Sequence, residues 1–135
     1  MGHFEQLLAH LIGDYILQTD RMARRKTSDD LYAVLHVLLY CVPFLVLGAS
    51  LKALVVIGGT HYLIDRYRLA LYVVKLKTVI DYSTAGCHEI RTQLCNLNEH
   101  GFPQGTPAYL GFWIVVIVDN TLHIAINAWA ITKFG

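Results

Sequence analysis

The chain has 135 residues, the length of one ordinary domain, and 55% of them are hydrophobic while only 16% are charged. This composition is richer in apolar side chains than a soluble domain needs, so it favours a membrane protein. The formal net charge of +1 gives no general field for a nucleic-acid partner. Three cysteines without a framework spacing exclude a disulfide scaffold. We expect a single integral membrane domain over residues 1–135.

The first apolar segment, Phe4 to Leu17, is short and partly polar. It is compatible with a tilted span, a half-span, or a helix packed beside others. A basic run, "RMARRK" at residues 21–26, follows it. We interpret this run as a topology signal that touches anionic lipid, because it is too short to indicate nucleic-acid binding.

The next segment, Leu31 to Leu51, contains no charged residue. At 1.5 Å per residue it is long enough to cross a hydrocarbon core of about 30 Å, with Pro43 as a kink. A weaker apolar segment, Leu51 to Leu71, meets Asp65, Arg66 and Arg68 near its end. This segment crosses the membrane only if its charged end reaches the membrane surface or faces other parts of the protein.

The last apolar segment, Pro107 to Thr132, is also long enough to span and carries one acid, Asp119. A polar region, Lys75 to Thr106, precedes it. Basic residues concentrate in the first and third connections, which the positive-inside rule places in the cytoplasm, with both termini outside. The prediction is an all-α, polytopic protein of the bacterial inner membrane. It has about four membrane-associated helices and a cytoplasmic region between the third and fourth.

Three of these segments each carry a histidine and an aspartate four positions apart. Residues at i and i+4 stack on adjacent helical turns, so each pair shares one helix face. The remaining segment, Leu31 to Leu51, adds a lone imidazole. The residues concerned are His10 and Asp14, His61 and Asp65, Asp119 and His123, and His36.

Two interpretations of these pairs remain open. Each pair can be a hydrogen-bonded structural feature that neutralises polar groups in the interior. Within a bilayer, however, an ionisable residue costs roughly 2.5–3.5 kcal/mol on insertion scales and by default indicates function. Imidazoles and carboxylates on facing helices suit a divalent zinc, manganese or iron ion. The candidate metal ligands are His10, Asp14, His36, His61, Asp65, Asp119 and His123.

The leading functional hypothesis is a metal-binding membrane protein. Its finer form is a metal-dependent hydrolase that acts near the cytoplasmic leaflet on a phosphate- or ester-containing substrate. A bound metal lowers the pKa of its water toward 7 and polarises a phosphoryl or carbonyl oxygen. Asp14 and Asp65 are candidate catalytic residues as well as ligands. Arg66 and Arg68 are candidates for holding an anionic group, and their alternative role is to anchor the helix at the membrane surface.

Two alternatives use the same residues differently. The first is an ion or proton conduit in which the histidines and aspartates form a relay. The second is a non-catalytic scaffold whose polar stripes hold helices together and whose basic connections bind partners or anionic lipid. The expected partners are therefore the lipid bilayer and an anionic lipid or substrate, with a homo-oligomer as one way to complete the site.

A second group of candidate ligands lies in "CHEIRTQLCNLNEH", at residues 87–100. It offers Cys87, His88, Cys95 and His100. The spacing matches no standard zinc module, so a loop or surface helix is favoured over a metal site.

Four stretches carry a resemblance to a known family: "LLAHLIGDYILQTDRMARRK", "LHVLLYCVPF", "GTHYLIDRYRLA" and "GTPAYLGFWIVVIVDNTLHIAINAWA". They resemble an uncharacterised family of small bacterial and phage integral membrane proteins, a domain of unknown function. More distantly, the pattern is similar to a family named as membrane-bound metal-dependent hydrolases. The resemblance implies that family positions include His10, Gly13, Asp14, Gln18, Asp20, His36, His61, Asp65, Asp119, Asn120 and His123.

Overall fold

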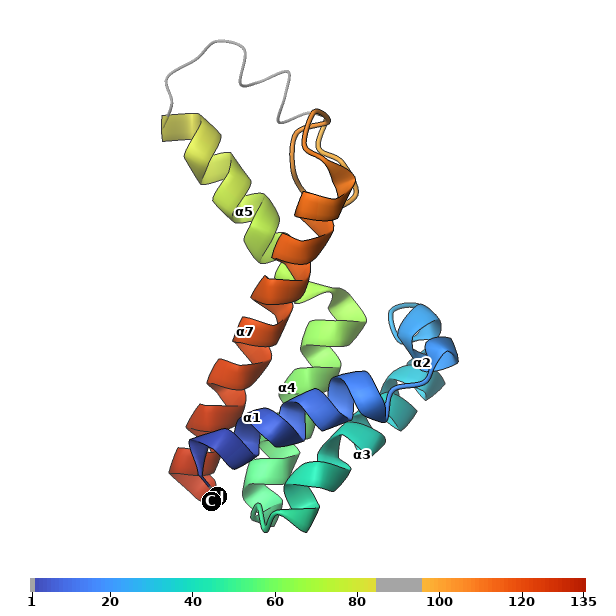
Figure 1. The fold of residues 1–135 in the computed structure, drawn as a ribbon, viewed down its shortest axis with the longest axis vertical. Coiled ribbons are helices and arrows are strands. Elements are labelled where there is room, and N and C mark those ends of the chain that lie inside the picture. Colours follow the sequence, from blue (N-terminus) through green and yellow to red (C-terminus); the bar gives the residue numbers. More distant parts are fainter. Residues whose placement is uncertain (1, 85–95) are drawn as a thin grey trace. The chain divides into compact units, whose positions relative to one another are not determined.

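A computed structural model of the protein describes residues 2–84 and 96–135, and the secondary structure of these residues is helical, without a β-strand (Figure 1). The elements in chain order are α1 (His3–Leu11), the π-helical turn η1 (Ile12–Ile16), α2 (Asp20–Arg25), α3 (Asp30–Val46), α4 (Leu51–Tyr67), α5 (Leu69–Thr84) and α7 (Ala108–Phe134). The prediction of an all-α chain is therefore confirmed for the described residues.

The chain divides into two compact units. One unit contains residues 1–68 and 121–135, and the other contains residues 69–120. The last helix, α7, begins in the second unit and ends in the first. The first unit holds α1 to α4 and the end of α7, so it contains all the predicted ligand residues except Asp119.

The prediction of about four membrane-associated helices is wrong. Among the described residues, only α7, with 27 residues, is long and apolar enough to cross a membrane. The segment predicted over Leu31–Leu51 forms α3, whose 17 residues extend only about 25 Å. This helix ends before Gly48, where a φ of 84° turns the chain. The predicted orientation, with both termini outside, required four membrane crossings. It no longer follows, because the described residues contain one candidate span.

Polar caps determine where the helices of the first unit begin. The hydroxyl of Thr19 accepts a hydrogen bond from the Met22 amide before α2, and the carboxylate of Asp29 accepts one from Leu31 before α3. The hydroxyl of Ser50 accepts one from the Ala53 amide at the start of α4. Such caps satisfy amides that have no partner inside the helix.

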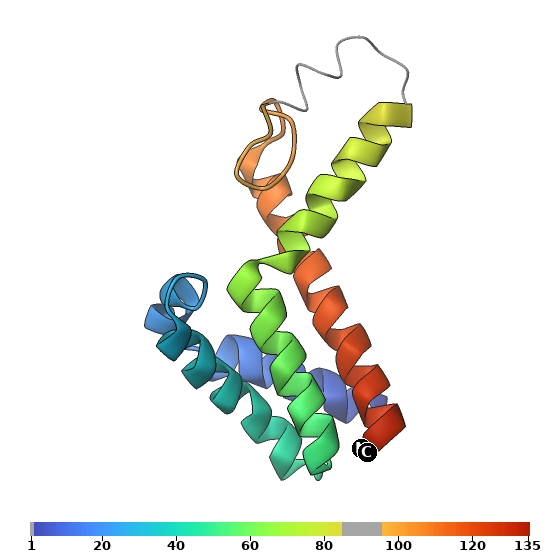
Figure 2. The same cartoon turned by 180° about the vertical axis from the view of Figure 1, so that it is seen from behind.

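The apolar core of the first unit lies where α3 and α4 pack together, beside α1 and the end of α7. The two views show α3 and α4 side by side (Figure 1, Figure 2). The cluster contains Ala9, Tyr40, Phe44, Ala49, Ala53, Ile57 and Ala130. In addition, the Ser50 hydroxyl donates to the Phe134 carbonyl, which joins the start of α4 to the end of α7.

The second unit contains α5 and the beginning of α7. The first ten residues of the region predicted as a polar connection, Lys75 to Thr106, belong to the helix α5, which ends at Thr84. A tight turn around Gly101, with φ 84°, brings Leu97 beside Pro103 in an isolated β-bridge. Pro107 stands directly before α7, where a proline is well tolerated because the first helical amides lack partners.

Candidate metal centre

Four side chains from three elements converge in the interior of the first unit. Asp14 comes from η1, His36 from α3, and His61 and Asp65 from adjacent turns of α4. One ligand atom of each lies within 4.8 Å of the others. The π-helical turn that carries Asp14 is an unusual local structure that often marks functional sites. We call these four residues the His/Asp cluster.

The two imidazoles occupy the middle of the His/Asp cluster. Their Nε2 atoms are 2.9 Å apart. Nε2 of His36 lies 3.2 Å from Asp14 Oδ1 and 3.1 Å from Asp65 Oδ2. Nε2 of His61 lies 3.4 Å and 3.1 Å from the same two oxygens. All four donor atoms therefore lie close together.

Each carboxylate of the cluster directs one oxygen inward and the other toward an outer histidine. Oδ2 of Asp14 lies 3.4 Å from His10 Nδ1, and Oδ1 of Asp65 lies 3.6 Å from Nε2 of His123 on α7. Polar groups next to metal ligands orient carboxylates and imidazoles around metals. The inward oxygens, Asp14 Oδ1 and Asp65 Oδ2, are thereby held toward the imidazoles.

The cluster is almost fully removed from solvent. His36 and His61 are 0% exposed and Asp65 is 7% exposed. Burying a carboxylate is costly unless a positive charge, a metal or hydrogen bonds compensate it. So many titratable groups in one place therefore require a compensating ion, proton or side chain.

A lysine supplies part of that compensation. Nζ of Lys26, which follows α2, lies 2.6 Å from Asp65 Oδ2 and 3.5 Å from His36 Nε2. Its side chain is 17% exposed, so the ammonium reaches inward from the surface. Lys26 therefore contacts two of the four donor atoms.

Hydrogen bonding keeps both carboxylates ionised despite burial. Burial alone would raise the pKa of Asp65, but hydrogen bonds from His123, His36 and His61 hold that pKa well below its usual value. Burial also raises the pKa of Asp14, but the hydrogen bond from His36 and the charge of His61 lower it below its usual value. Both groups are thus negative at neutral pH.

The two central imidazoles differ in their affinity for a proton. Burial disfavours the charged form of His36, yet hydrogen bonds to Asp14 and Asp65 raise its pKa. For His61, burial is the largest influence and lowers the pKa. Of the two imidazoles, whose Nε2 atoms are 2.9 Å apart, His36 therefore holds a proton more firmly than His61.

A second buried network supports the cluster from behind. The hydroxyl of Tyr40 lies 2.9 Å from His10 Nδ1 and accepts a hydrogen bond of 2.6 Å from Asn127 Nδ2. The Tyr40 ring stacks on the His61 imidazole, with centroids 3.6 Å apart and planes 19° apart. Gln6 donates weakly, over 3.5 Å, to the Ile124 carbonyl. These contacts fix the rotamers of His10 and His61.

The structure places the remaining predicted residues as follows. Asp119 lies in the second unit, one helical turn before His123 on α7, so both leave the helix on one face. The guanidinium of Arg66 contacts Asp30 Oδ1 at 2.6 Å and the Thr27 carbonyl. Arg68 is exposed and has a left-handed backbone, with φ 52°. Both of these contacts of Arg66 lie outside the His/Asp cluster.

The second group of candidate ligands, for which a loop or surface helix is favoured over a metal site, lies mostly outside the described residues. Cys87, His88 and Cys95 lie outside the described residues. His100 is described, and its Nδ1 lies 3.9 Å from Glu99 Oε1.

Sequence reasoning missed three residues of the site: Lys26, Tyr40 and Asn127. Lys26 lies inside a basic run that resembles a topology signal, and nothing in its local pattern separates it from its neighbours. Asn127 follows Asp119 and His123 at the same four-residue spacing, which was a usable signal. Tyr40 likewise follows His36 by four residues on α3.

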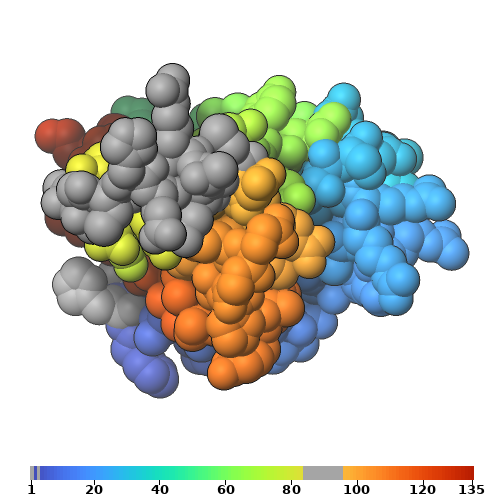
Figure 3. Space-filling model, turned by 90° about the horizontal axis from the view of Figure 1, so that it is seen from above, coloured from blue at the N-terminus to red at the C-terminus, as the bar shows by residue number. Residues whose placement is uncertain are grey.

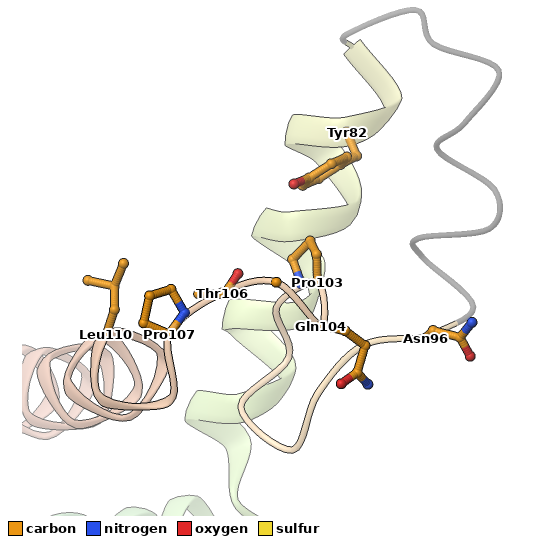
Figure 4. A pocket seen from close by; sticks show the side chains of 8 residues that line it. Tyr82, Asn96, Pro103, Gln104, Thr106, Pro107 and Leu110 are labelled. Carbon is orange, nitrogen blue, oxygen red and sulfur yellow. The ribbon is translucent and has the colours of Figure 1, made fainter.

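The second unit contains an open recess of about 690 Å³ (Figure 4). Tyr82 of α5 points toward it, and the segment before α7 forms its other side. The described lining residues, which include no charged group, are Tyr82, Asn96, Pro103, Gln104, Gly105, Thr106, Pro107 and Leu110. The recess therefore offers apolar contacts and amide groups, without a set of metal ligands.

The fold and the site together define an all-helical protein with a buried centre of histidines and aspartates. Residues 3–90 match the family described as "Protein of unknown function (DUF3307)". Because the match covers about two thirds of the chain, the protein belongs to this family. The matched residues include Asp14, His36, His61 and Asp65. No curated protein and no solved structure matches the chain.

These comparisons confirm the prediction of an uncharacterised family. They give no support to the more distant similarity to membrane-bound hydrolases, nor to the membrane character of the family.

Proposed function

We propose that this protein binds a divalent metal ion of the zinc class through Asp14, His36, His61 and Asp65. The observation that carries the proposal is the spacing of the donor atoms. A regular tetrahedron whose centre lies about 2.0–2.1 Å from each corner has edges of about 3.3–3.4 Å. The five separations given above between an imidazole nitrogen and another donor atom range from 2.9 to 3.4 Å.

The chemistry of the donors supports zinc over harder ions. Two imidazole nitrogens and two carboxylate oxygens suit zinc, manganese and iron, whereas calcium and magnesium prefer oxygen ligands alone. Zinc is favoured among the three because it accepts four ligands in tetrahedral geometry. The outer histidines, His10 and His123, would orient the two carboxylates.

A hydrolase is the finer hypothesis, and it requires that three of the four residues, rather than all four, bind the metal. Catalytic zinc sites keep three protein ligands and one open position, whereas four protein ligands make a closed, structural site. His36, His61 and Asp65 would be the three ligands, and a bound metal would supply a water of lowered pKa. Asp14, ionised and close to both imidazoles, would then accept a proton from that water.

Metal content tests the binding proposal. Elemental analysis of protein purified with zinc present should find close to one zinc per chain, and His61→Ala should lose most of it. His100→Ala is the matched control, because it removes an imidazole outside the cluster. Zinc content equal in the wild type and His61→Ala would overturn the proposal.

The variant Asp14→Asn distinguishes a closed site with four protein ligands from an open site with three. If Asp14 acts as a base, this variant should retain zinc but lose hydrolysis of p-nitrophenyl phosphate or p-nitrophenyl acetate. If Asp14 is a fourth ligand, zinc content should fall together with that of His61→Ala. Wild-type protein that holds zinc but hydrolyses neither ester would remove the support for the hydrolase hypothesis with these substrates.

A metal-free structural network is the second candidate, and one contact favours it. Lys26 already provides Asp65 with a cationic partner at 2.6 Å. A protein that is equally stable with and without zinc, and that purifies without it, would favour this scaffold role.

We also propose that the chain associates with a bacterial inner membrane through α7. Its length and composition are those of a single span, and Trp113 and Trp129 lie near its ends with more than half of each side chain exposed. Resistance of the membrane-bound protein to an alkaline carbonate wash is the expected result. Recovery in the soluble fraction would contradict it.

A further inference from the structure

Lys26 lies where a bound metal would also lie. Its Nζ atom is 2.6 Å from Asp65 Oδ2 and 3.5 Å from His36 Nε2, and both atoms belong to the proposed ligand set. A zinc ion would lie about 2.0–2.2 Å from the same two atoms. Two cations so close together in a buried site repel strongly. The ammonium and the metal therefore compete for Asp65.

The helix before Lys26, α2, is short and exposed. Helix α2 has only six residues and buries none of them, and it lies at the molecular surface (Figure 3). Arg24 pairs with Asp20 outside, where both side chains are more than three-quarters exposed. Lys26 is thus the side chain of this segment that enters the cluster, whereas Arg24 and Arg25 are exposed.

The segment is not held by Lys26 alone. The guanidinium of Arg66 donates to the Thr27 carbonyl, and Arg25 lies 5.2 Å from the centroid of the Tyr32 ring. These contacts would remain after the ammonium left Asp65. Loss of the Lys26 contact therefore needs only a change of the lysine rotamer or a local displacement of α2, without unfolding of α3.

We propose that Lys26 is a built-in counter-ion of the metal-free protein, and that binding of a divalent metal expels its ammonium from Asp65 into solvent. This inference rests on the proposed metal site. It makes Lys26 a determinant of metal affinity and couples occupancy of the cluster to the exposure of α2. In the metal-free protein, the same lysine neutralises a buried carboxylate that would otherwise be costly.

The first test measures zinc affinity by competition with a chelator of known affinity. Lys26→Met keeps the length of the apolar stem and removes the charge. We expect it to bind zinc at least about tenfold more tightly than the wild type, because no ammonium must be displaced. The matched control is Arg24→Met, which removes one exposed positive charge from the same helix. It should change the affinity by less than about twofold.

The second test uses wild-type protein and does not depend on a variant that folds. N-hydroxysuccinimidyl acetate acylates accessible amines, and mass spectrometry reports the extent at each lysine. We expect acylation of Lys26 to be slow without zinc and several times faster with it. Lys52 and Lys133 are exposed and distant from the cluster along the chain, so they should react equally in both states.

The results distinguish this inference from the proposal on which it rests. If the wild type binds zinc while Lys26 stays unreactive, or if Lys26→Met binds zinc no more tightly, Lys26 is not displaced and the inference is wrong. If the wild type binds no zinc at all, the metal site itself is wrong. A gain in affinity with Lys26→Met, together with faster acylation of Lys26, supports both.

Discussion

The ring of Tyr40 lies face to face with the imidazole of His61, with centroids 3.6 Å apart and an angle of 19° between the planes. The same tyrosine holds His10 and Asn127 through its hydroxyl. One side chain thus connects the proposed ligand His61 with the histidine that orients Asp14. The position of the metal ligands depends on this packing as well as on their own helices.

Tyr40→Phe should keep the stacked ring and lose both hydrogen bonds. Because His10 and Asn127 are buried, their polar atoms would lose a partner that water cannot replace, at a cost of about 1–3 kcal/mol in the free energy of unfolding. Urea denaturation measures this change. The control is Tyr72→Phe, at an exposed tyrosine. Equal stability of Tyr40→Phe and the wild type would show that the buried network contributes little.

Gly13→Ala should disturb the cluster through Tyr40. A Cβ at residue 13 would lie 2.6 Å from Tyr40 Cδ2 and 3.1 Å from Tyr40 Cα, so η1 and α3 must separate. We expect a loss of about 1–3 kcal/mol, typical of overpacking. We also expect weaker zinc binding, because Asp14 is the next residue and Tyr40 supports His61.

The matched control is Gly59→Ala. Gly59 also lies in a helix, but a Cβ there meets nothing within 4 Å. Alanine should stabilise α4 by up to about 1 kcal/mol, because it has the higher helix propensity. If both variants behaved alike, the close approach of η1 to α3 would be wrong.

The ion pair between Asp30 and Arg66 should give the stability a dependence on acid pH. Hydrogen bonds from Arg66 and Tyr62 lower the pKa of Asp30 below its usual value. A carboxyl whose folded pKa is lowered contributes stability that is present above its unfolded pKa and is lost as the pH falls through the folded pKa. Asp30→Asn should therefore be less stable than the wild type at pH 7, and this difference should disappear in strong acid.

Thermal denaturation between pH 7 and pH 2 measures this difference. Asp20→Asn is the control, because it removes a carboxylate from an exposed pair with Arg24. A difference between Asp30→Asn and the wild type that stayed constant as the pH fell would contradict the assignment.

The local part of the site could be predicted from the sequence. A spacing of four places His61 and Asp65 on one face of a helix, and both do contribute to the cluster from α4. The same spacing joins His10 to Asp14, although a π-helical turn begins between them. Regular helix geometry is nearly independent of tertiary structure, so such pairs can be recognised from the sequence alone.

The contacts between elements could not be predicted in the same way. Lys26 reaches Asp65 across 39 positions in the chain, and only the packing of α2 beside α3 determines which of four basic residues turns inward. The membrane prediction failed for a related reason. An uncharged segment of 21 residues predicts one span, but Gly48 and the Ser50 cap end one helix and begin another inside it.

The central claim is that two histidines and two aspartates of the cluster surround one metal ion. Extended X-ray absorption fine structure at the zinc edge of zinc-loaded protein tests it most directly. The structure predicts nitrogen and oxygen ligands at about 2.0–2.1 Å, with multiple scattering from two imidazoles that falls to one in His61→Ala. A sulfur shell near about 2.3 Å, or a spectrum unchanged by His61→Ala, would place the zinc elsewhere and contradict the claim.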